Sequence, residues 1–524
     1  MLPLLLAFVL NIIIQHTAMA QHTAMAGEKP NIVLILIDDM GWKDISCMGN
    51  QYYRTPNIDQ FASEGVLFTQ AYSSAPNCSP SRGAIFSGQY PARTKMTTVF
   101  PPEALPSDSL RQVEYDKKNA PGFQTQGPAF RWYLHPDQVT FAEVLQVNGY
   151  KTGYLGKWHC GWLPSQQPGK QGFEVVEGVL TTPSFTPGHW GKNYMPPLAA
   201  ELPGLKEDEY MSEALTRRAE DFIAKNKQSP FLLVVSHYLV HLPLQAQPEK
   251  LAKWKKMPTT DQDNPTMAAM IESVDESVGR ILAALKKNGL EKNTTVIFTS
   301  DNGGYHGATS TYPLLGSKGM PYEGGYRVPF IVKWPGHVRG GRKETTPTMQ
   351  IDLYPTILNL TNTLPDPNQH LDGVSLLPLL AGAGTIKDRP LFFHFPHYSD
   401  FGCSPFSAVR YQQWKLYHYY NNSAGTYHLF DLEQDPFEQD DLSLANPEKV
   451  RQLQTMLDKW IVETEASFPV PNPVYNPSAI QEFTRNYTYG ESVKIRHDQE
   501  IKIKKTNSIR KLKNSLMIRK RTNF

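Results

Sequence analysis

NIVLILIDD, residues 31–39, joins an unbroken apolar run to two adjacent aspartates. An apolar run of this length is typical of a strand that is buried on both faces of a sheet. Runs of the same kind recur further along the chain, at 231–235 (FLLVV), 295–299 (TVIFT) and 328–333 (VPFIVK). The sequence therefore predicts a central sheet that is covered on both faces.

Helical patterns separate these runs. Apolar residues recur with the spacing of an amphipathic helix near 57–64, 139–148, 210–225 and 266–288. Strands that alternate with helices indicate an α/β protein whose large central sheet is mostly parallel and lies between helices. The chain has 524 residues, of which 40% are hydrophobic, and this is enough for a large core and a second, smaller domain.

The character of the sequence changes after about residue 390. Short aromatic stretches follow one another at 391–395 (LFFHF), 408–420 (AVRYQQWKLYHYY) and 427–432 (YHLFDL), before a helical pattern at about 447–464. This order predicts a small antiparallel sheet with one covering helix, an α+β module. The expected units are a main catalytic domain over 27–385 and a C-terminal subdomain over 386–480.

The N-terminal residues resemble a signal peptide. The apolar run MLPLLLAFVLNIII (1–14) is too short to span a bilayer, and the tandem hexapeptide QHTAMA over 15–26 supplies two Ala-Met-Ala sites. We expect a signal peptide over 1–26, cleaved after Ala20 or Ala26, and export to the periplasm or out of the cell, or to the lysosome or extracellular space in a eukaryote. No other segment has the uninterrupted apolar length of a membrane helix, so no membrane span is expected.

The C-terminal tail is strongly basic. Residues 494–524 contain eleven Lys or Arg and two Asp or Glu, although the net charge of the whole chain is only +2. Because the tail has little apolar periodicity, the sequence predicts a disordered extension over 481–524. The alternative interpretation is an electrostatic anchor for a polyanion, whether a sulfated polysaccharide, a membrane surface or a nucleic acid.

Polar side chains follow three of the apolar runs. Asp38 and Asp39 come after the first run, Asp301 and Asn302 after the third, and SHYLVH (236–241) after the second. The ends of parallel strands are where α/β proteins place functional groups, so we expect one shared site. Adjacent buried carboxylates need a cation, and an all-oxygen ligand set favours Ca²⁺ or Mg²⁺ over zinc. Either pair alone could instead cap the turn that follows it.

CSPSRG, residues 78–83, is the most specific motif, and Ser87-Gly88 follows it. This pattern resembles the signature of the type I sulfatases, the formylglycine-dependent arylsulfatase family, although that family usually has Thr at the position of Ser87. Other segments resemble the family in its own order: PNIVLILIDDMGW, TGYLGKWHCG, SHYLVHLP, SDNGG, GSKGMPYEGGYRVP, QIDLYPTIL, LDGVSLLPLL and YHLFDLEQDPFEQDDL.

The resemblance implies an alkaline-phosphatase-like fold and hydrolysis of sulfate esters. It implies that a formylglycine-generating enzyme, or an anaerobic sulfatase-maturating enzyme, oxidises Cys78 to formylglycine (3-oxoalanine). It further implies one Ca²⁺ ion, with Mg²⁺ as the alternative. The implied metal ligands are Asp38, Asp39, residue 78, Asp301 and Asn302. If Cys78 is consumed, the remaining Cys47, Cys160 and Cys403 allow at most one disulfide, whereas four thiols would allow two.

The resemblance also assigns catalytic roles. The hydrated aldehyde attacks sulfur with one hydroxyl, for which Asp301 is the implied base. Arg82 and Lys157 stabilise the resulting anion, while Lys318 and His241, rather than His237, contact the sulfate and protonate the departing alcohol. His159 then removes the second hydroxyl proton, which releases sulfate and restores the aldehyde.

Other charged and aromatic positions have open interpretations. We expect Glu323 and Arg327 to form a structural ion pair. Three histidines, His306, His394 and His397, could line a sugar pocket, although histidines flanked by aromatic residues are at least as often packing residues.

The predicted export and the basic tail favour a sulfated carbohydrate as substrate, such as a polysaccharide or glycosaminoglycan fragment. Two alternatives are a phosphate mono- or diester hydrolase of the same superfamily and a non-catalytic binder of sulfated glycans. No nucleic-acid partner is expected. An unmodified Cys78 together with phosphatase activity would favour the first alternative.

Overall fold

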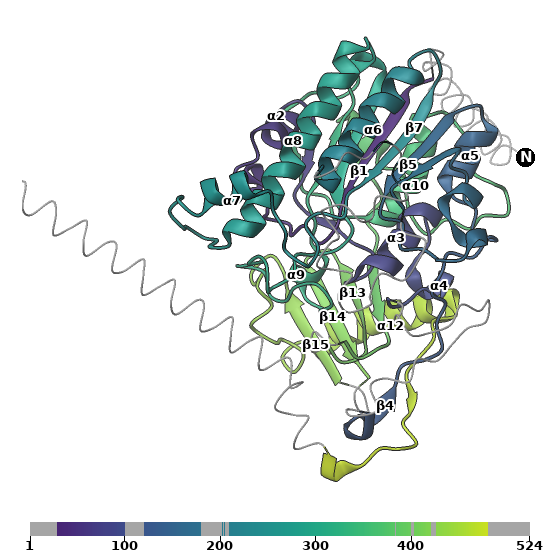
Figure 1. Cartoon of the computed structure of the whole chain (residues 1–524). Helices are drawn as coiled ribbons and strands as arrows, with labels where there is room; N and C mark the ends of the chain where they lie inside the picture. Colours follow the sequence, from purple (N-terminus) through teal and green to yellow (C-terminus); the bar gives the residue numbers. More distant parts are fainter. Residues whose placement is uncertain are drawn as a thin grey trace, which may run out of the picture.

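An eight-stranded sheet runs through the main body of the protein (Figure 1). The computed structural model describes residues 29–99, 120–179, 202, 204, 209–382, 384–399, 403–420 and 426–479. The predicted signal peptide (1–26) and basic tail (481–524) lie outside these residues. In spatial order the strands are β10 (Arg342–Glu344), β2 (Val66–Phe68), β9 (Phe330–Lys333), β8 (Thr294–Ser300), β1 (Asn31–Ile37), β7 (Phe231–Ser236), β5 (Lys151–Gly156) and β6 (Val175–Glu177).

The central strands of this sheet are parallel. Strand β1 pairs in parallel with both β8 and β7, so that Ile35 lies beside Phe298 on one side and Val235 on the other. Strand β5 continues the parallel arrangement between β7 and β6. Strand β9 runs antiparallel to both of its neighbours, β8 and β2. The prediction of a mostly parallel central sheet is confirmed.

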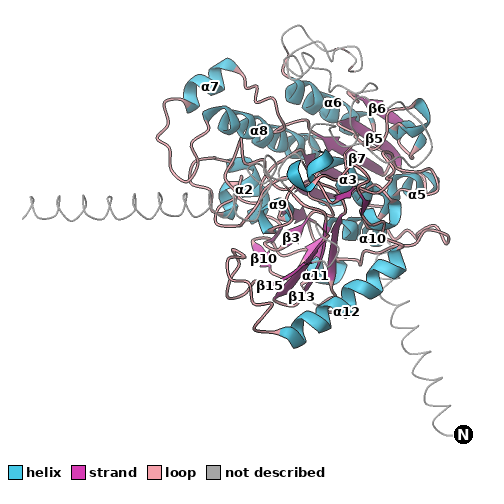
Figure 2. Cartoon of the chain, turned by 90° about the horizontal axis from the view of Figure 1, so that it is seen from below, coloured by secondary structure: helices cyan, strands magenta, loops and turns pink. Residues whose placement is uncertain are grey.

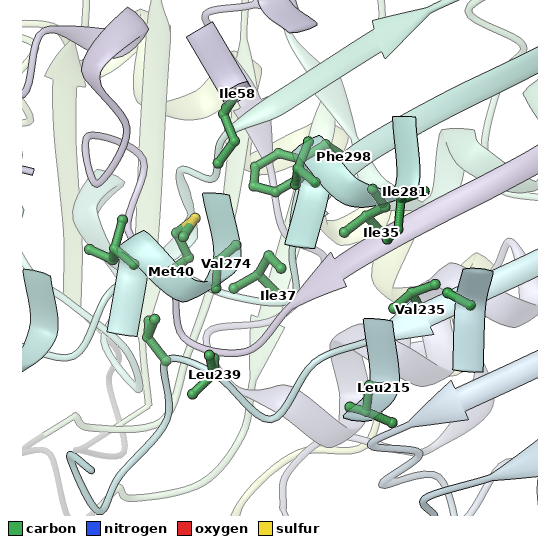
Figure 3. Close-up of a cluster of buried hydrophobic side chains, with 14 of the residues drawn as sticks. Ile35, Ile37, Met40, Ile58, Leu215, Val235, Leu239, Val274, Ile281 and Phe298 are labelled. Carbon is green, nitrogen blue, oxygen red and sulfur yellow. The ribbon is translucent and has the colours of Figure 1, made fainter. Parts of the chain in front are cut away.

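Alternating side chains of β1 enter two different cores, because successive residues of a strand point to opposite faces. Val33, Ile35 and Ile37 pack on one face with helices α2 (Pro56–Ser63), α6 (Met211–Lys225) and α8 (Pro265–Lys287). Figure 3 shows Ile35 and Ile37 beside Phe298 and Val274 in this cluster. Both faces of the sheet are therefore covered, as the continuous apolar run predicts.

The other face of the sheet packs against a second group of helices. Ile32, Leu34 and Leu36 belong to a core that includes apolar residues of α3 (Cys78–Ser87), α5 (Phe141–Val147), α10 (Leu353–Leu360) and α11 (Leu377–Ala381). Figure 1 shows α6 and α8 on one side of strands β1 and β7 and α3, α5 and α10 on the other. The helices predicted near 57–64, 139–148, 210–225 and 266–288 are all present, with ends shifted by one or two residues.

Local sequence explains where two of these helices begin. Thr140 and Glu143 form a capping box at the start of α5, in which each side chain binds the backbone N–H of the other residue. The Asn264 side chain accepts hydrogen bonds from the N–H groups of Thr266 and Met267, and Pro265 occupies the first position of α8.

A separate four-stranded antiparallel sheet lies at one end of the main sheet (Figure 1). Its strands, in order, are β12 (Leu391–Phe395), β13 (Phe406–Tyr411), β14 (Trp414–Tyr419) and β15 (Thr426–Asp431). Helix α12 (Pro447–Thr464) packs on β13 and β14 (Figure 2), and buries Leu453, Leu457 and Trp460. The predicted antiparallel sheet with one covering helix is confirmed, and the stretch 408–420 folds back on itself at Gln412, whose φ is 56°.

Short elements complete the fold. They are β3 (Ala71–Tyr72), β4 (Thr125–Gln126), β11 (Thr348–Met349), β16 (Val470–Pro471), α4 (Pro91–Thr94), α7 (Pro248–Trp254) and α9 (Glu323–Tyr326). Helix α9 lies between the loops of the main sheet and the strands β13 and β14 (Figure 1). The predicted Glu323–Arg327 ion pair forms within and just after α9, with 3.3 Å between Oε2 and Nη1.

All four cysteines are free thiols, so neither of the disulfide arrangements that the sequence allows is formed. In the part of the chain that the structure describes, no helix is both long enough and apolar enough to cross a bilayer.

We predict that Val274→Ala in α8 lowers the free energy of unfolding by about 2 kcal/mol, because it removes two buried methyl groups and leaves a cavity beside β1. Urea denaturation followed by circular dichroism measures the change. The matched control is Val147→Ala in α5, where the same methyl groups are 87% exposed and their loss should leave the urea midpoint unchanged. Equal midpoints for the two variants would contradict the packing described for α8.

Candidate active site

Four adjacent parallel strands, β8, β1, β7 and β5, end at the same edge of the main sheet. The loops that follow them carry the predicted site residues, because the carboxyl ends of parallel strands face the same side. These residues are Asp301 and Asn302 after β8, Asp38 and Asp39 after β1, His241 after β7, and Lys157 and His159 after β5.

Cys78 lies at the first position of helix α3, facing the two aspartates. Its Sγ is 3.4 Å from Oδ1 of Asp38 and 3.8 Å from Oδ1 of Asp39, and the residue is 1% exposed. Burial and the neighbouring Asp301 raise the pKa of the Cys78 thiol well above its usual value, although Lys157 and Lys318 oppose the rise. An unmodified Cys78 is therefore a protonated thiol and a poor nucleophile at neutral pH.

Three cations surround the two aspartates. Nζ of Lys157 is 2.5 Å from Oδ2 of Asp38, and Nζ of Lys318 is 2.7 Å from Oδ2 of Asp39. Nη2 of Arg82 lies 3.8 Å from Oδ1 of Asp38. Burial alone would raise the pKa of both aspartates, but Lys157 for Asp38 and Lys318 for Asp39 bring each pKa below its usual value. The aspartates are therefore ionised in the fold, and each has its own cation.

Arg82 is fixed by three further groups. Its Nε donates to Oδ2 of Asp301 at 2.8 Å, and its Nη1 donates to the carbonyl of Lys157 and to Oγ of Ser236, each at 2.7 Å. The remaining nitrogen, Nη2, makes no hydrogen bond in the described part of the chain and is completely buried. The guanidinium thus presents one donor toward Cys78 and the aspartates while its other donors hold it in place.

The backbone around the site adopts conformations that side-chain-bearing residues rarely use. Asp39 and His159 both have positive φ angles, 63° and 58°. Gly303 approaches the α9 backbone so closely that a Cβ there would lie 2.2 Å from the carbonyl oxygen of Gly324. The loops after β1, β5 and β8 are therefore held in strained or tightly packed forms, which is common at functional sites.

The structure brings three of the five predicted metal ligands, Asp38, Asp39 and Cys78, close together. Ligand atoms of Asp38, Asp39, Cys78 and His241 lie within 4.8 Å of one another. The Nδ2 of Asn302 donates to Oδ1 of Asp39 at 2.8 Å, while its buried Oδ1 accepts no hydrogen bond from any described residue. The amide nitrogen also donates to the carbonyl of Gly303 at 3.0 Å. Carboxylate oxygens and an amide oxygen without a partner are the kind of ligands that Ca²⁺ and Mg²⁺ prefer.

Asp301 is not one of the four residues of this group, and both of its oxygens accept hydrogen bonds, as do those of Asp38 and Asp39. Oδ2 accepts from Arg82 and Oδ1 accepts from the backbone N–H of Asp39 at 3.1 Å. The structure thus places Asp301 beside the group of ligand atoms, and brings His241 into that group instead.

Two histidines of the site have distinct surroundings. His241 contacts the carbonyl of Leu242 through Nδ1 at 2.7 Å, so Nδ1 carries the proton and Nε2 faces Oδ2 of Asp39 at 3.6 Å. His159 is 7% exposed, and burial together with Lys157 and Arg82 lowers its pKa well below the usual value. His159 is therefore a neutral imidazole that can accept a proton.

His237 is a core residue, as expected from the choice of His241. Its Nε2 lies 3.0 Å from Oγ of Ser277 in helix α8, and Nδ1 has no hydrogen-bond partner among the described residues. Burial lowers the pKa of His237 to about 4.

The three histidines considered for a sugar pocket lie in different places. His306 is exposed beside the Lys318 loop, with Nδ1 3.3 Å from Oγ of Ser317. His394 is buried in β12, where its ring nitrogens contact Ser407 and the carbonyl of Ser467. His397 is also buried and contacts Oγ1 of Thr97. His394 and His397 therefore pack within the C-terminal sheet region, whereas His306 lies at the site's edge.

Sequence reasoning missed several residues that shape the site. Ser236 holds Arg82, the hydroxyl of Ser300 accepts from the N–H of Met40 at 2.9 Å, and Gln350 donates to the carbonyl of Ser300. Asp44 accepts from the N–H of Gly41 at 2.7 Å and from the hydroxyl of Thr309. Ser236, Ser300 and Gln350 each begin a motif quoted above, and Asp44 lies just after one, but no sequence pattern indicated the contacts that these side chains make.

Comparison with known proteins shows matches over most of the chain. The family model described as Sulfatase matches residues 30–363, and a model described as N-sulphoglucosamine sulphohydrolase, C-terminal, matches residues 315–467. A protein of Formosa agariphila named sulfatase is 31% identical, in an alignment that covers 86% of this chain and 92% of that protein. The N-acetylgalactosamine-6-sulfatase of Mus musculus is 32% identical over 72% of this chain and 71% of its own length.

A solved structure is also similar. The crystal structure of Ps i-CgsB in complex with k-i-k-neocarrahexaose has a TM-score of 0.69 and 31% sequence identity to this chain. The match covers 83% of this chain and 93% of that one.

We predict that His237→Gln makes the protein less sensitive to acid. The neutral His237 contributes stability that is present above its usual pKa near 6.5 and is lost as pH falls through its folded pKa of about 4. Between pH 6.5 and pH 4 the variant should therefore lose up to about 3 kcal/mol less unfolding free energy than wild type does. Urea midpoints across this pH range measure the difference.

The matched control for this prediction is His337→Gln, which replaces an exposed imidazole. It should leave the pH dependence of wild type unchanged. Parallel urea midpoint curves for His237→Gln and wild type would contradict a buried, neutral His237.

Proposed function

Because this chain belongs to the sulfatase family and is a sulfuric ester hydrolase, we propose that it uses a formylglycine made from Cys78, together with a calcium ion, to hydrolyse sulfated carbohydrates. The observation that carries the proposal is the position of Cys78. It lies buried at the start of α3, within 4 Å of two aspartates, where its own thiol stays protonated. A thiol in this position is of little use as a nucleophile, whereas an aldehyde can be hydrated there.

The aldehyde, when hydrated, supplies a hydroxyl that attacks sulfur and a second hydroxyl whose proton can be removed later. The calcium ion, when bound by Asp38, Asp39, Asp301, Asn302 and residue 78, supplies positive charge opposite the sulfate oxygens. Helix α3 adds a further favourable field, since the N-terminus of a helix stabilises negative charge.

Arg82 and Lys157 hold negative charge near residue 78. Arg82 directs its Nη2 toward this position, and Lys157 reaches it from the end of β5. Asp301, which lies beside both Arg82 and Asp39, is the proposed acceptor for the proton of the attacking hydroxyl. Because these groups are buried and already oriented, little reorganisation is needed when charge develops.

Lys318 and His241 serve the departing alcohol. Both side chains contact Oδ2 of Asp39 from the open side of the site, where His241 keeps 15% of its side chain exposed. They are placed to hold the sulfate oxygens, and the Lys318 ammonium, or His241 once its Nε2 is protonated, is placed to donate a proton to the departing oxygen. His159, a neutral imidazole beside Lys157, is the proposed acceptor of the second hydroxyl proton.

Support for a carbohydrate substrate comes from the similar proteins. One curated relative is named for N-acetylgalactosamine-6-sulfate chemistry, and the similar solved structure contains a hexaose. Both reach at least 31% identity over more than two thirds of this chain. Export, which the apolar run at 1–14 predicts, would bring the enzyme to extracellular polysaccharide and would expose Cys78 to a maturation enzyme on the way.

We predict that coexpression with a formylglycine-generating enzyme converts Cys78 to formylglycine and that sulfate-ester hydrolysis depends on the conversion. Mass spectrometry of the tryptic peptide Thr55–Arg82 detects the change, and a panel of sulfated sugars measures turnover. Cys78→Ala should lower turnover at least about a thousandfold, because it removes the nucleophile.

Cys47→Ala is the control for loss of a thiol outside the site, and it should leave turnover unchanged. An intact Cys78 in an active preparation would refute the proposed nucleophile. Hydrolysis of phosphate esters by that unmodified protein, without turnover of sulfate esters, would instead support a phosphate ester hydrolase.

We also predict that Ca²⁺ raises the thermal midpoint of the protein even when Cys78 is unmodified, because the ion binds the folded state. At a hundredfold excess over the dissociation constant the stabilisation should be about 2.7 kcal/mol. Asn302→Leu should abolish most of this shift, because it removes the buried carbonyl oxygen that lacks a partner.

Asn368→Leu replaces an exposed amide far from the site in sequence and should retain the full calcium shift. Differential scanning calorimetry with and without Ca²⁺ measures both variants. A midpoint that responds to Zn²⁺ but not to Ca²⁺ or Mg²⁺ would refute the assignment of a hard cation.

A further inference from the structure

The loop that carries Lys318 contacts two other segments of the site. The N–H of Lys318 donates to the carbonyl of Gly304 at 2.9 Å, in the loop after β8. The N–H of Gly319 donates to the carbonyl of Pro76 at 2.7 Å, two residues before Cys78. The position of the Lys318 ammonium therefore depends on where this loop, residues 317–322, is held.

The C-terminal sheet holds the same loop from its other side. The hydroxyl of Tyr417 in β14 lies 3.1 Å from the carbonyl oxygen of Pro321 and also contacts Oε1 of Glu438. The next contact is with Glu323, whose N–H donates to Oε2 of Glu438 at 2.7 Å. Its side chain accepts from Nζ of Lys415, also in β14, at 2.7 Å. Three residues of the C-terminal module thus contact the end of the Lys318 loop and the first residue of α9.

These contacts are buried and charged. Lys415 is fully buried, and its Nζ also lies 3.4 Å from Oε1 of Glu438. Burial raises the pKa of Glu438 to about 7, although Lys415 opposes the rise, so this carboxylate depends on Lys415 for its charge. Well-packed apolar residues commonly stabilise a fold as well as or better than such a buried ionic group, so stability alone is a weak reason for it. What the buried ionic group does is fix the positions of Lys415, Glu323 and Glu438 relative to one another.

Glu438 lies in a turn with an unusual backbone conformation. It has a φ of 54°, in the left-handed region that residues other than glycine seldom adopt. Asp435 closes the turn, since its Oδ2 accepts from the N–H groups of Gln439 and Asp440 at 2.6 and 2.9 Å. This unfavourable backbone conformation places the Glu438 carboxylate against the N–H of Glu323.

We propose that Glu438, Lys415 and Tyr417 are positioning residues for Lys318, so that the C-terminal sheet sets the alignment of the catalytic ammonium. This inference rests on the proposed function, in which Lys318 assists departure of the alcohol. Among the described residues, no hydrogen bond or ion pair joins any of the three to Asp38, Asp39, Cys78 or His241. They act on Lys318 through Pro321 and Glu323. The C-terminal module then contributes to the active site by positioning Lys318.

The test uses the full-length, matured enzyme and aryl sulfates of graded phenol acidity. Glu438→Gln should lower kcat between about tenfold and a hundredfold, as expected when a catalytic group is displaced from a distance, with a smaller change in KM. The loss should grow as the leaving phenol becomes less acidic, because Lys318 matters most for poor leaving groups. Lys318→Ala should show the same dependence more strongly, and the double variant should lose little beyond Lys318→Ala.

Tyr417→Phe removes one hydroxyl, which contacts both Pro321 and Glu438, and gives a second variant that should fold, with the same leaving-group dependence at smaller size. Glu433→Gln changes an exposed carboxylate of the same module and should match wild type. Losses that are equal for all leaving groups and that track a lowered thermal midpoint would overturn the inference, since they indicate a purely structural role. A matured wild-type enzyme that hydrolyses no sulfate ester would overturn the proposed function and this inference with it.

Discussion

The pairing of two adjacent buried carboxylates with separate cations is the interaction on which the site depends. Asp38 and Asp39 follow the central strand of the sheet, in a region where an unpaired charge would be very unfavourable. Lys157 and Lys318 each neutralise one aspartate, and they come from loops that are more than 150 residues apart in sequence. Because both aspartates at the end of β1 must be neutralised, the loop after β5 and the loop before α9 have to lie next to each other there.

The sheet provides the rigid frame for this charge pattern. Because β1 is flanked by β7 and β8 and is buried on both faces, its end is fixed by hydrogen bonds on two sides and by two apolar cores. The loops beyond the strands are held by backbone contacts instead, such as the close approach of Gly303 to Gly324. Rigid strands and tightly packed loops together account for a site whose donors are oriented in advance.

Much of the fold could be predicted from the sequence because its central strands are continuous apolar runs. Strands β1, β7 and β8 were recognisable for this reason, whereas β5 contains Gly153 and Gly156, and β2, β6 and β10 have only three residues each. In the site, Cys78, Arg82 and the aspartates belong to motifs with a specific spacing. Ser236 and Gln350 were not predictable, because their roles arise only when distant loops meet. The link from Lys415 and Glu438 to Glu323 escaped prediction for the same reason.

The burial of helix α3 bears on when Cys78 can be modified. Every one of its ten residues is buried, and Cys78 at its start is 1% exposed. A macromolecule cannot reach a side chain this deeply covered unless the surrounding chain opens. If Cys78 is modified as proposed, the modification therefore precedes folding around α3, and a molecule that folds first keeps its cysteine for as long as it stays folded. Folding and modification would then compete for the same chain.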